Sequence, residues 1–179
     1  MNKVENLIAE VSTARNNFLQ QLSFFSEEKA KWKPTAEIWC ATEITEHLFW
    51  AEQGAIIGMW KTLYTIREGK MERTYDSVHK EMPVEKIIEL TWKDKEIVPA
   101  VAAPRVGGPL SFWYASLSSL QQVLETFGND LKENELRILA HPHPISGPMD
   151  FQQRLEFLRL HLNRHEAQVA ALMEEIKHS

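Results

Sequence analysis

Three of the seven histidines in this chain lie at positions from which they could bind one metal ion together. His161 and His165 are four residues apart, so on a helix their Cβ atoms lie on one face, about 5 to 6 Å apart. Each follows a leucine of the same apolar stripe by three residues, which turns the pair inward. His47 follows Ile44 in the same way on another predicted helix. Neutral imidazole binds Zn, Ni, Cu and Fe, and a site with three nitrogen ligands keeps coordination positions free.

Other interpretations of the histidines stay open at this point. A histidine on an apolar face is usually half-buried and hydrogen-bonded to the backbone, and the spacing H-x-x-x-H also arises by chance. Gln168, three residues after His165, is spaced to orient an imidazole, and it is equally well a surface amide. His141 and His143 belong to a His-Pro-His-Pro turn, and we expect them to be turn residues rather than ligands.

Several other kinds of site are excluded by their motifs. A carboxylate-bridged di-iron bundle needs Glu-x-x-His on two helices, and the sequence has it only at Glu175 and His178, near the C-terminal end. The haem motif C-x-x-C-H, the protease motif H-E-x-x-H and a phosphate-binding glycine loop are all missing from the sequence. The three inward histidines are therefore the candidate site.

Composition and charge limit the classes of partner and the cellular compartment that we expect for this protein. The chain has 20 Lys and Arg against 25 Asp and Glu, a net charge of −5, so electrostatic capture of nucleic acid or of an anionic membrane is not expected. The single cysteine excludes an internal disulfide framework and is compatible with a reducing compartment. The N-terminal segment lacks the apolar run of a signal peptide, and the sequence holds no apolar window long enough to span a bilayer. We expect a cytoplasmic protein.

The elements that position these residues follow from the prolines and the apolar spacing. Long proline-free windows cover residues 35–82, 110–141 and 149–179, and apolar residues recur in them every three or four positions. A similar stripe precedes Pro34. The pattern predicts four helices: one ending near Phe25, one from after Trp39 to Gly69, one from Leu110 to Gly128 and Asn129, and one from Phe151 to Ile176.

The second of these helices begins with an unusual capping sequence. Cys40 stands where a capping box normally has Ser or Thr, three residues before Glu43. We expect Cys40 to be a small apolar residue at the helix start. It lies about 10.5 Å along the axis from His47, which is too far for a fourth ligand.

The fold class follows from these elements. Between residues 74 and 108 the pattern weakens to one short amphipathic candidate after Pro83 and a stretch rich in Pro and Gly. Sustained alternation of apolar and polar residues is missing throughout, so strands are not expected. The sequence predicts an all-α protein, a single domain over residues 1–179, folded as a four-helix bundle with a long crossover between helices two and three.

Three stretches also resemble a known family. Residues 31–34 (KWKP) lead to 39–48 (WCATEITEHL), similar to W-S-x-x-E-I-x-x-H-L; 141–149 (HPHPISGPM) follow; and 157–168 (FLRLHLNRHEAQ) are similar to F-L-x-x-H-x-x-R-H-x-x-Q. Together they resemble the DinB-like superfamily of DNA-damage-inducible proteins, and within it the YfiT-like group. Cys40 replaces the usual serine, and residues 74–108 carry no family pattern.

The resemblance implies a divalent metal ion, zinc first and nickel second, on His47, His161 and His165. The superfamily includes thiol-dependent S-transferases and maleylpyruvate isomerases, which implies a low-molecular-weight thiol and a small electrophilic substrate as partners. Homodimers recur in the family, so a homodimer is a further expectation.

Two classes of function remain. In the first, the protein is a metal-dependent transferase or hydrolase, in which the ion acts as a Lewis acid and Gln168 orients; no separate general base can be named. In the second, it is a non-catalytic, stress-associated helical bundle whose metal site is vestigial or merely stabilising. Fold alone does not choose between them.

Overall fold

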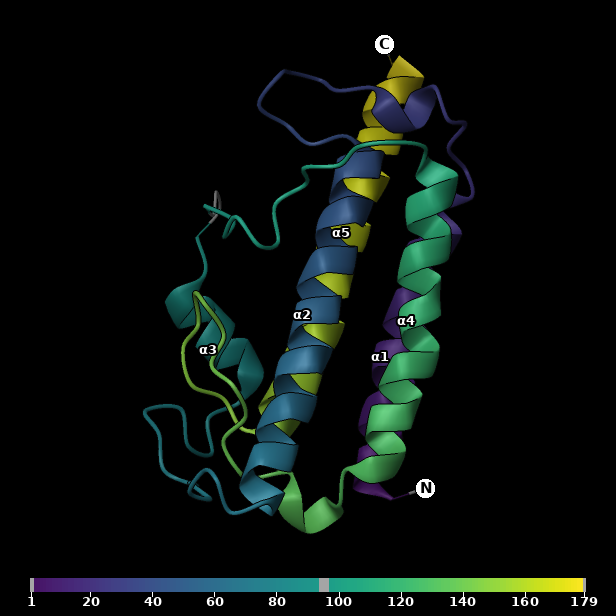
Figure 1. Ribbon diagram of the computed structural model, residues 1–179. Helices are drawn as coiled ribbons and strands as arrows, with labels where there is room; N and C mark the ends of the chain where they lie inside the picture. Colours follow the sequence, from purple (N-terminus) through teal and green to yellow (C-terminus); the bar gives the residue numbers. More distant parts are fainter. Residues whose placement is uncertain (1, 94–96, 179) are drawn as a thin grey trace.

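The computed structural model describes residues 2–93 and 97–178, and over these ranges its regular structure is helical (Figure 1). Two short 3-10 helices, Lys29–Lys31 and Glu133–Glu135, lie in the connections. Extended pairing among the described residues is limited to two isolated bridges. The α-helices are α1 (Lys3–Leu22), α2 (Ala41–Arg67), α3 (Val84–Thr91), α4 (Leu110–Asp130) and α5 (Phe151–His178).

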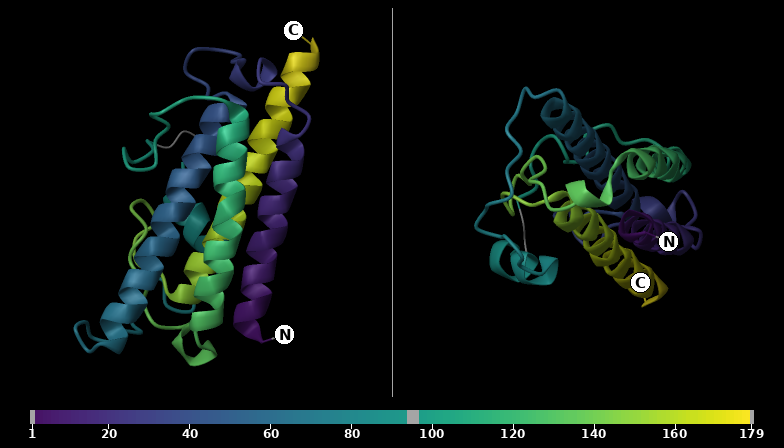
Figure 2. Two further views of the ribbon diagram at one scale, coloured as in Figure 1. Left: turned by 45° about the vertical axis from the view of Figure 1, so that its right-hand side comes forward. Right: turned by 90° about the horizontal axis from the view of Figure 1, so that it is seen from below.

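Four of these helices form the bundle, and α3 lies outside it against α5 (Figures 1 and 2). Helices α1 and α5 run toward the end where the C-terminus lies, whereas α2 and α4 run in the opposite direction. Because α2 and α4 are parallel, the chain must return along the whole bundle between them, and residues 68–109 make that return. The predicted four-helix bundle with a long crossover between its second and third helices is confirmed.

The core consists of the apolar stripes that the spacing predicts. Each bundle helix turns its stripe into the bundle, and the main contacts run from α1 to α4 and α5 and from α2 to the same two helices. Along the described residues, no helix combines the length and apolar character needed to cross a bilayer. Residues of the core without solvent exposure include Val11, Phe18, Met59, Leu63, Leu117, Leu124, Phe127, Leu155 and Val169.

A buried ion pair also crosses this core. The guanidinium of Arg15 on α1 donates to the carboxylate of Glu52 on α2 and to the amide oxygen of Gln121 on α4. Arg15 and Glu52 are 1% and 2% exposed, and burial lowers the pKa of Arg15 to about 10. Losing one partner of such a pair leaves a buried charge, which typically costs about 3 to 5 kcal/mol. The pair therefore fixes how three of the helices face one another.

The helix starts depend on carboxylates that accept backbone N–H groups. Glu43 accepts the N–H of Cys40 at 3.0 Å at the start of α2, and the Cys40 side chain is buried there, as the capping sequence predicts. Glu27, in the connection after α1, accepts the N–H groups of Leu110 and Ser111 at 2.7 and 3.0 Å. Those bonds lower the pKa of Glu27. The connection after α1 thus caps the distant helix α4.

The predicted helix ends lie within three residues of those in the structure. The first helix ends at Leu22 and continues only as turns, instead of reaching Phe25. The fourth helix of the structure, α4, runs through Gly128 and Asn129 to Asp130. Gly128 therefore does not end the helix. A glycine is needed at this position because a Cβ on it would lie 2.6 Å from Cγ1 of Ile8. Its lack of a side chain is what lets α1 approach α4.

We expect Gly128→Ala to lower the free energy of unfolding by about 1 kcal/mol, because overpacking against Ile8 outweighs the gain in helix propensity. Gly54→Ala on α2 is the matched control, since a Cβ there would meet no atom within 4 Å. It should raise the free energy of unfolding by about 0.5 to 1 kcal/mol. Urea unfolding of the two variants measures both values. Equal stabilisation by both would contradict the close packing of α1 on α4.

Candidate metal centre

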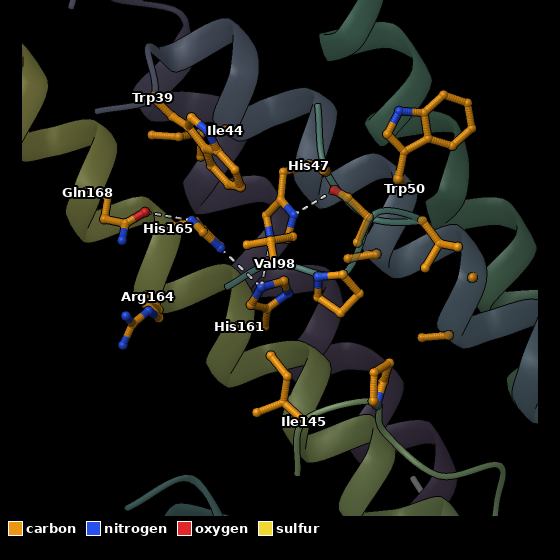
Figure 3. A pocket seen from close by; sticks show the side chains of 18 of the residues that line it. Trp39, Ile44, His47, Trp50, Val98, Ile145, His161, Arg164, His165 and Gln168 are labelled. Atoms are coloured by element: carbon orange, nitrogen blue, oxygen red, sulfur yellow. Dashed lines mark hydrogen bonds between the residues drawn. The ribbon is translucent and has the colours of Figure 1, made fainter. Parts of the chain in front are cut away.

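His47 of α2 and His161 and His165 of α5 meet in the seam between these two helices (Figure 3). The Nε2 atom of His161 lies 3.1 Å from Nε2 of His47 and 3.0 Å from Nε2 of His165. The ligand atoms of all three side chains lie within 4.8 Å of one another. The structure thus brings together the three residues that the helical spacing selected.

Hydrogen bonds on the outer side of two rings fix which nitrogen carries the proton. Nδ1 of His47 lies 2.8 Å from the carbonyl oxygen of Ala102, and Nδ1 of His165 lies 2.7 Å from Oε1 of Gln168. Both oxygens can only accept, so each Nδ1 donates and each Nε2 keeps its lone pair. Gln168 therefore orients an imidazole, as its spacing suggested. The carbonyl of Ala102 does the same for His47.

The three facing nitrogens have the chemistry of a ligand set for a cation. His47 and His165 both present lone pairs to Nε2 of His161, and a single proton on that atom can point at only one of them. Burial lowers the pKa of all three imidazoles, to about 3 for His165, so the neutral ligand form is favoured. A positive ion between the rings would satisfy all three lone pairs at once.

The segment that carries Ala102 is held in place by Glu46, the residue before His47. The Glu46 carboxylate accepts the backbone N–H groups of Arg105, Val106 and Gly107 at 2.7, 2.8 and 2.9 Å. Burial alone would raise the pKa of Glu46, but these bonds lower it overall. One turn of α2 therefore supplies a ring to the cluster and also anchors the crossover segment that orients it.

A cavity of about 1140 Å³ opens beside the three histidines. Trp39, Ile44 and Trp50 form part of its wall, and Val98 and Ile145 contribute from two connections (Figure 3). This volume is large enough for a small organic molecule, and the lining combines apolar and aromatic side chains with charged and polar groups. The cluster therefore faces a space in which a substrate and free coordination positions can coexist.

The other two histidines of interest lie in the turn, as expected, and are not members of the cluster. His143 Nδ1 accepts the backbone N–H groups of Ile145 and Ser146 at 3.2 and 3.0 Å. His141 packs against Gly58 of α2, where a Cβ would lie 2.7 Å from its ring. Both histidines line the cavity, a role that their place in a turn did not indicate.

Two further contributors to the site were missed by the reasoning from the sequence. A main-chain carbonyl such as that of Ala102 has no residue type to reveal it, and it lies in the region without a family pattern. Arg154 lines the same cavity, yet it has the spacing of an ordinary charged residue near the start of a helix. An arginine next to the apolar residues Phe151, Leu155 and Leu158 was the only available signal.

Comparison with solved structures supports the fold. The chain matches YfiT from Bacillus subtilis, described as a probable metal-dependent hydrolase with an unusual four-helix bundle topology, with a TM-score of 0.65 and 14% identity over 99% of this chain and 90% of that one. A conserved protein from Enterococcus faecalis matches with a TM-score of 0.61 and 15% identity, covering 96% of this chain and 95% of the other. At these identities the likeness concerns the fold alone.

Comparison of sequences gives the family. The uncharacterized protein YuaE of Bacillus subtilis (strain 168) is 28% identical over 170 residues, covering 92% of this chain and 95% of that protein. The family model of the DinB superfamily matches residues 10–169, from within α1 to within α5 and including all three clustered histidines. Its span confirms the resemblance of the sequence motifs, and the protein belongs to the DinB superfamily.

Proposed function

We propose that this protein binds one divalent transition-metal ion through His47, His161 and His165 and uses it to catalyse hydrolysis or thiol transfer on a small molecule. The observation that carries the proposal is the convergence of the Nε2 atoms of three imidazoles, two of which, His47 and His165, are oriented by hydrogen bonds at Nδ1. The description of YfiT as a probable metal-dependent hydrolase supports it at the level of the fold.

The donor set favours a transition-metal ion over Mg or Ca, and the family resemblance puts zinc first and nickel second. The cluster consists of nitrogen ligands, and among the described residues it includes no carboxylate or thiolate. Imidazole donors suit Zn, Ni, Cu and Fe, whereas Mg and Ca prefer oxygen. When bound, such an ion acts as a Lewis acid that makes water or a thiol reactive near neutral pH.

The protein's own residues orient the histidine rings, shield the cluster from bulk water and leave space for a substrate. His47 and His165 are fixed by Ala102 and Gln168, so little ring freedom remains to be lost when a ligand arrives. Trp39 packs beside His47 with ring centroids 5.1 Å apart, which limits the access of bulk water to that side. The remaining side of the cluster faces the cavity, where a small thiol and an electrophile, or an ester and water, would be held.

The first expected outcome concerns metal content. Purified protein supplemented with zinc or with nickel should contain about one ion per chain by elemental analysis, and His161→Ala should contain almost none. His178→Ala is the matched control, because His178 is exposed on the same helix. Gln168→Ala should weaken metal affinity by about 10- to 100-fold through the loss of ring orientation. Wild-type protein without metal after supplementation would contradict the proposal.

The second expected outcome concerns turnover. Metal-loaded protein should hydrolyse activated esters or join a low-molecular-weight thiol to an electrophile, and the activity should disappear after chelation and in His161→Ala. Both substrate classes are assayed on the same preparation. Stoichiometric metal without turnover on either class would favour the alternative, a non-catalytic bundle with a stabilising site.

The third expected outcome concerns chelation. The core residues described above pack without help from the site, so we expect the metal-free protein to keep its helical far-ultraviolet circular dichroism. Free metal at one hundred times the dissociation constant adds about 2.7 kcal/mol of stability, which raises the unfolding midpoint by roughly 5 to 10 °C. Loss of the helical signal on chelation at room temperature would instead make the ion structural.

A further inference from the structure

Arg154 carries a buried positive charge that the three-histidine cluster does not explain. The residue is 2% exposed, and its Nε and Nη1 atoms are buried with no hydrogen-bond partner in the part of the chain that the structure describes. Its guanidinium carbon lies 5.9 Å from the ring centre of Phe157, a contact that supplies no acceptor. Burial lowers the pKa of Arg154 to about 10, so the group is charged at neutral pH. A buried charge without a partner costs free energy of folding, and a bound anion would remove that cost.

A second unpaired group lies beside it. Nδ1 of His141 is also buried without a hydrogen-bond partner among the described residues. Burial, followed by the nearby charge of Arg154, lowers the pKa of His141 to about 4, so its ring is neutral and can donate one hydrogen bond. Both side chains line the cavity that contains the three histidines. Gly58 gives the His141 ring the room that a Cβ would fill.

No carboxylate of the described protein is placed to neutralise Arg154. Asp150, which precedes it by one helical turn, pairs with Arg137 at 3.2 Å and accepts the backbone N–H of Gln153 at 2.8 Å. Glu37 and Glu175 also line the cavity, but both are exposed. Glu175 lies 21 residues further along α5, about 30 Å away along its axis. Glu37 belongs to the connection between α1 and α2, which lies at the end of the bundle where α5 ends (Figure 1). The end of the cavity at Arg154 is therefore positive and uncompensated.

We propose that Arg154 and His141 form a subsite for the anionic oxygen group, a carboxylate or a phosphate, of the small molecule on which this protein acts. That the molecule is a substrate rests on the proposed function; the anion subsite itself does not. A planar guanidinium presents paired N–H donors that match such oxygens, and the low dielectric of a buried site strengthens the interaction.

The spacing along α5 limits the size of this molecule. Arg154 and His161 are seven residues apart, two helical turns or about 10.5 Å along the axis, and one cavity connects them. A molecule held at Arg154 must be several bonds long to bring another group to the histidines. The subsite therefore selects organic acids or phosphate esters of intermediate length, and formate or acetate would not reach from one to the other.

Calorimetric titration of metal-free protein tests the subsite apart from metal chemistry. The probes are sodium hexanoate, uncharged hexanamide and inorganic phosphate. We expect hexanoate or phosphate to bind the wild type and hexanamide not to bind. Tighter binding of phosphate would assign the subsite to phosphate esters, and tighter binding of hexanoate to carboxylic acids. No binding of either anion at concentrations up to tens of millimolar would overturn the proposal.

Variants of Arg154 and of Gly58, which packs against His141, test whether these two side chains bind the anion. Arg154→Met should lower the affinity for the bound anion by about 10- to 100-fold, the range for hydrogen bonds to charged groups, and Arg154→Lys should lower it less. Gly58→Ala, which displaces His141 without touching the arginine, should also weaken binding. Arg73→Met, at an exposed arginine outside the cavity, is the matched control and should bind like the wild type. Unchanged affinity in both Arg154 variants would overturn the assignment.

The stability of the protein without metal or anion gives a second test of the subsite. If Arg154 is unpaired until an anion binds, metal-free Arg154→Met should unfold at the same urea concentration as the wild type or a higher one, because an unpaired buried charge is removed. If Arg154 served the fold instead, its substitution would lower the stability of the protein, and that result would count against the subsite. Anion binding by a protein that takes up no metal would leave the subsite standing and contradict only the proposed function.

Discussion

The meeting of three imidazole nitrogens, with Nε2 of His161 at 3.1 and 3.0 Å from Nε2 of His47 and of His165, sets the constraint on which the functional half of this molecule depends. Two of them come from successive turns of α5, so their spacing is fixed by the helix itself. The third comes from α2, so its place depends on how these two helices are registered. A slide of one helix by a single turn, about 5.4 Å, would separate the rings. The bundle must therefore hold α2 and α5 in one register without help from the cluster.

The core supplies that register on the side away from the histidines. The ion pair between Arg15 and Glu52, together with Gln121, links α1, α2 and α4 at one level of the bundle. Ile8 against Gly128 fixes the approach of α1 to α4, and α1 in turn packs along α5. The polar pair is satisfied, so it specifies alignment without leaving an open charge. Nε and Nη1 of Arg154, also buried, find no such partner among the described residues, and this contrast separates a charge that serves the fold from one that serves a ligand.

The sequence was sufficient for the helices and for the three clustered histidines, and insufficient for what surrounds them. Prolines and apolar spacing are local signals, so α2, α4 and α5 could be placed within a few residues. His161 and His165 are related by helical geometry alone, and His47 by its place on an inward stripe. Ala102 contributes a carbonyl, which every residue has, and Gly128 was misjudged because its neighbour Ile8 is 120 positions away. Such features depend on contacts between distant segments, which periodicity does not report.

The parallel direction of α2 and α4 connects the topology to the site. It obliges residues 68–109 to travel the length of the bundle, and that path crosses the face where α2 and α5 form the cavity. The return segment thereby provides a wall at Val98 and a hydrogen-bond acceptor at Ala102, and Glu46 secures it from α2. In a bundle with short antiparallel connections this acceptor would have to come from a side chain. The long crossover is thus the element that encloses the histidines, and substitutions within it can alter the cavity while the four-helix core remains unchanged.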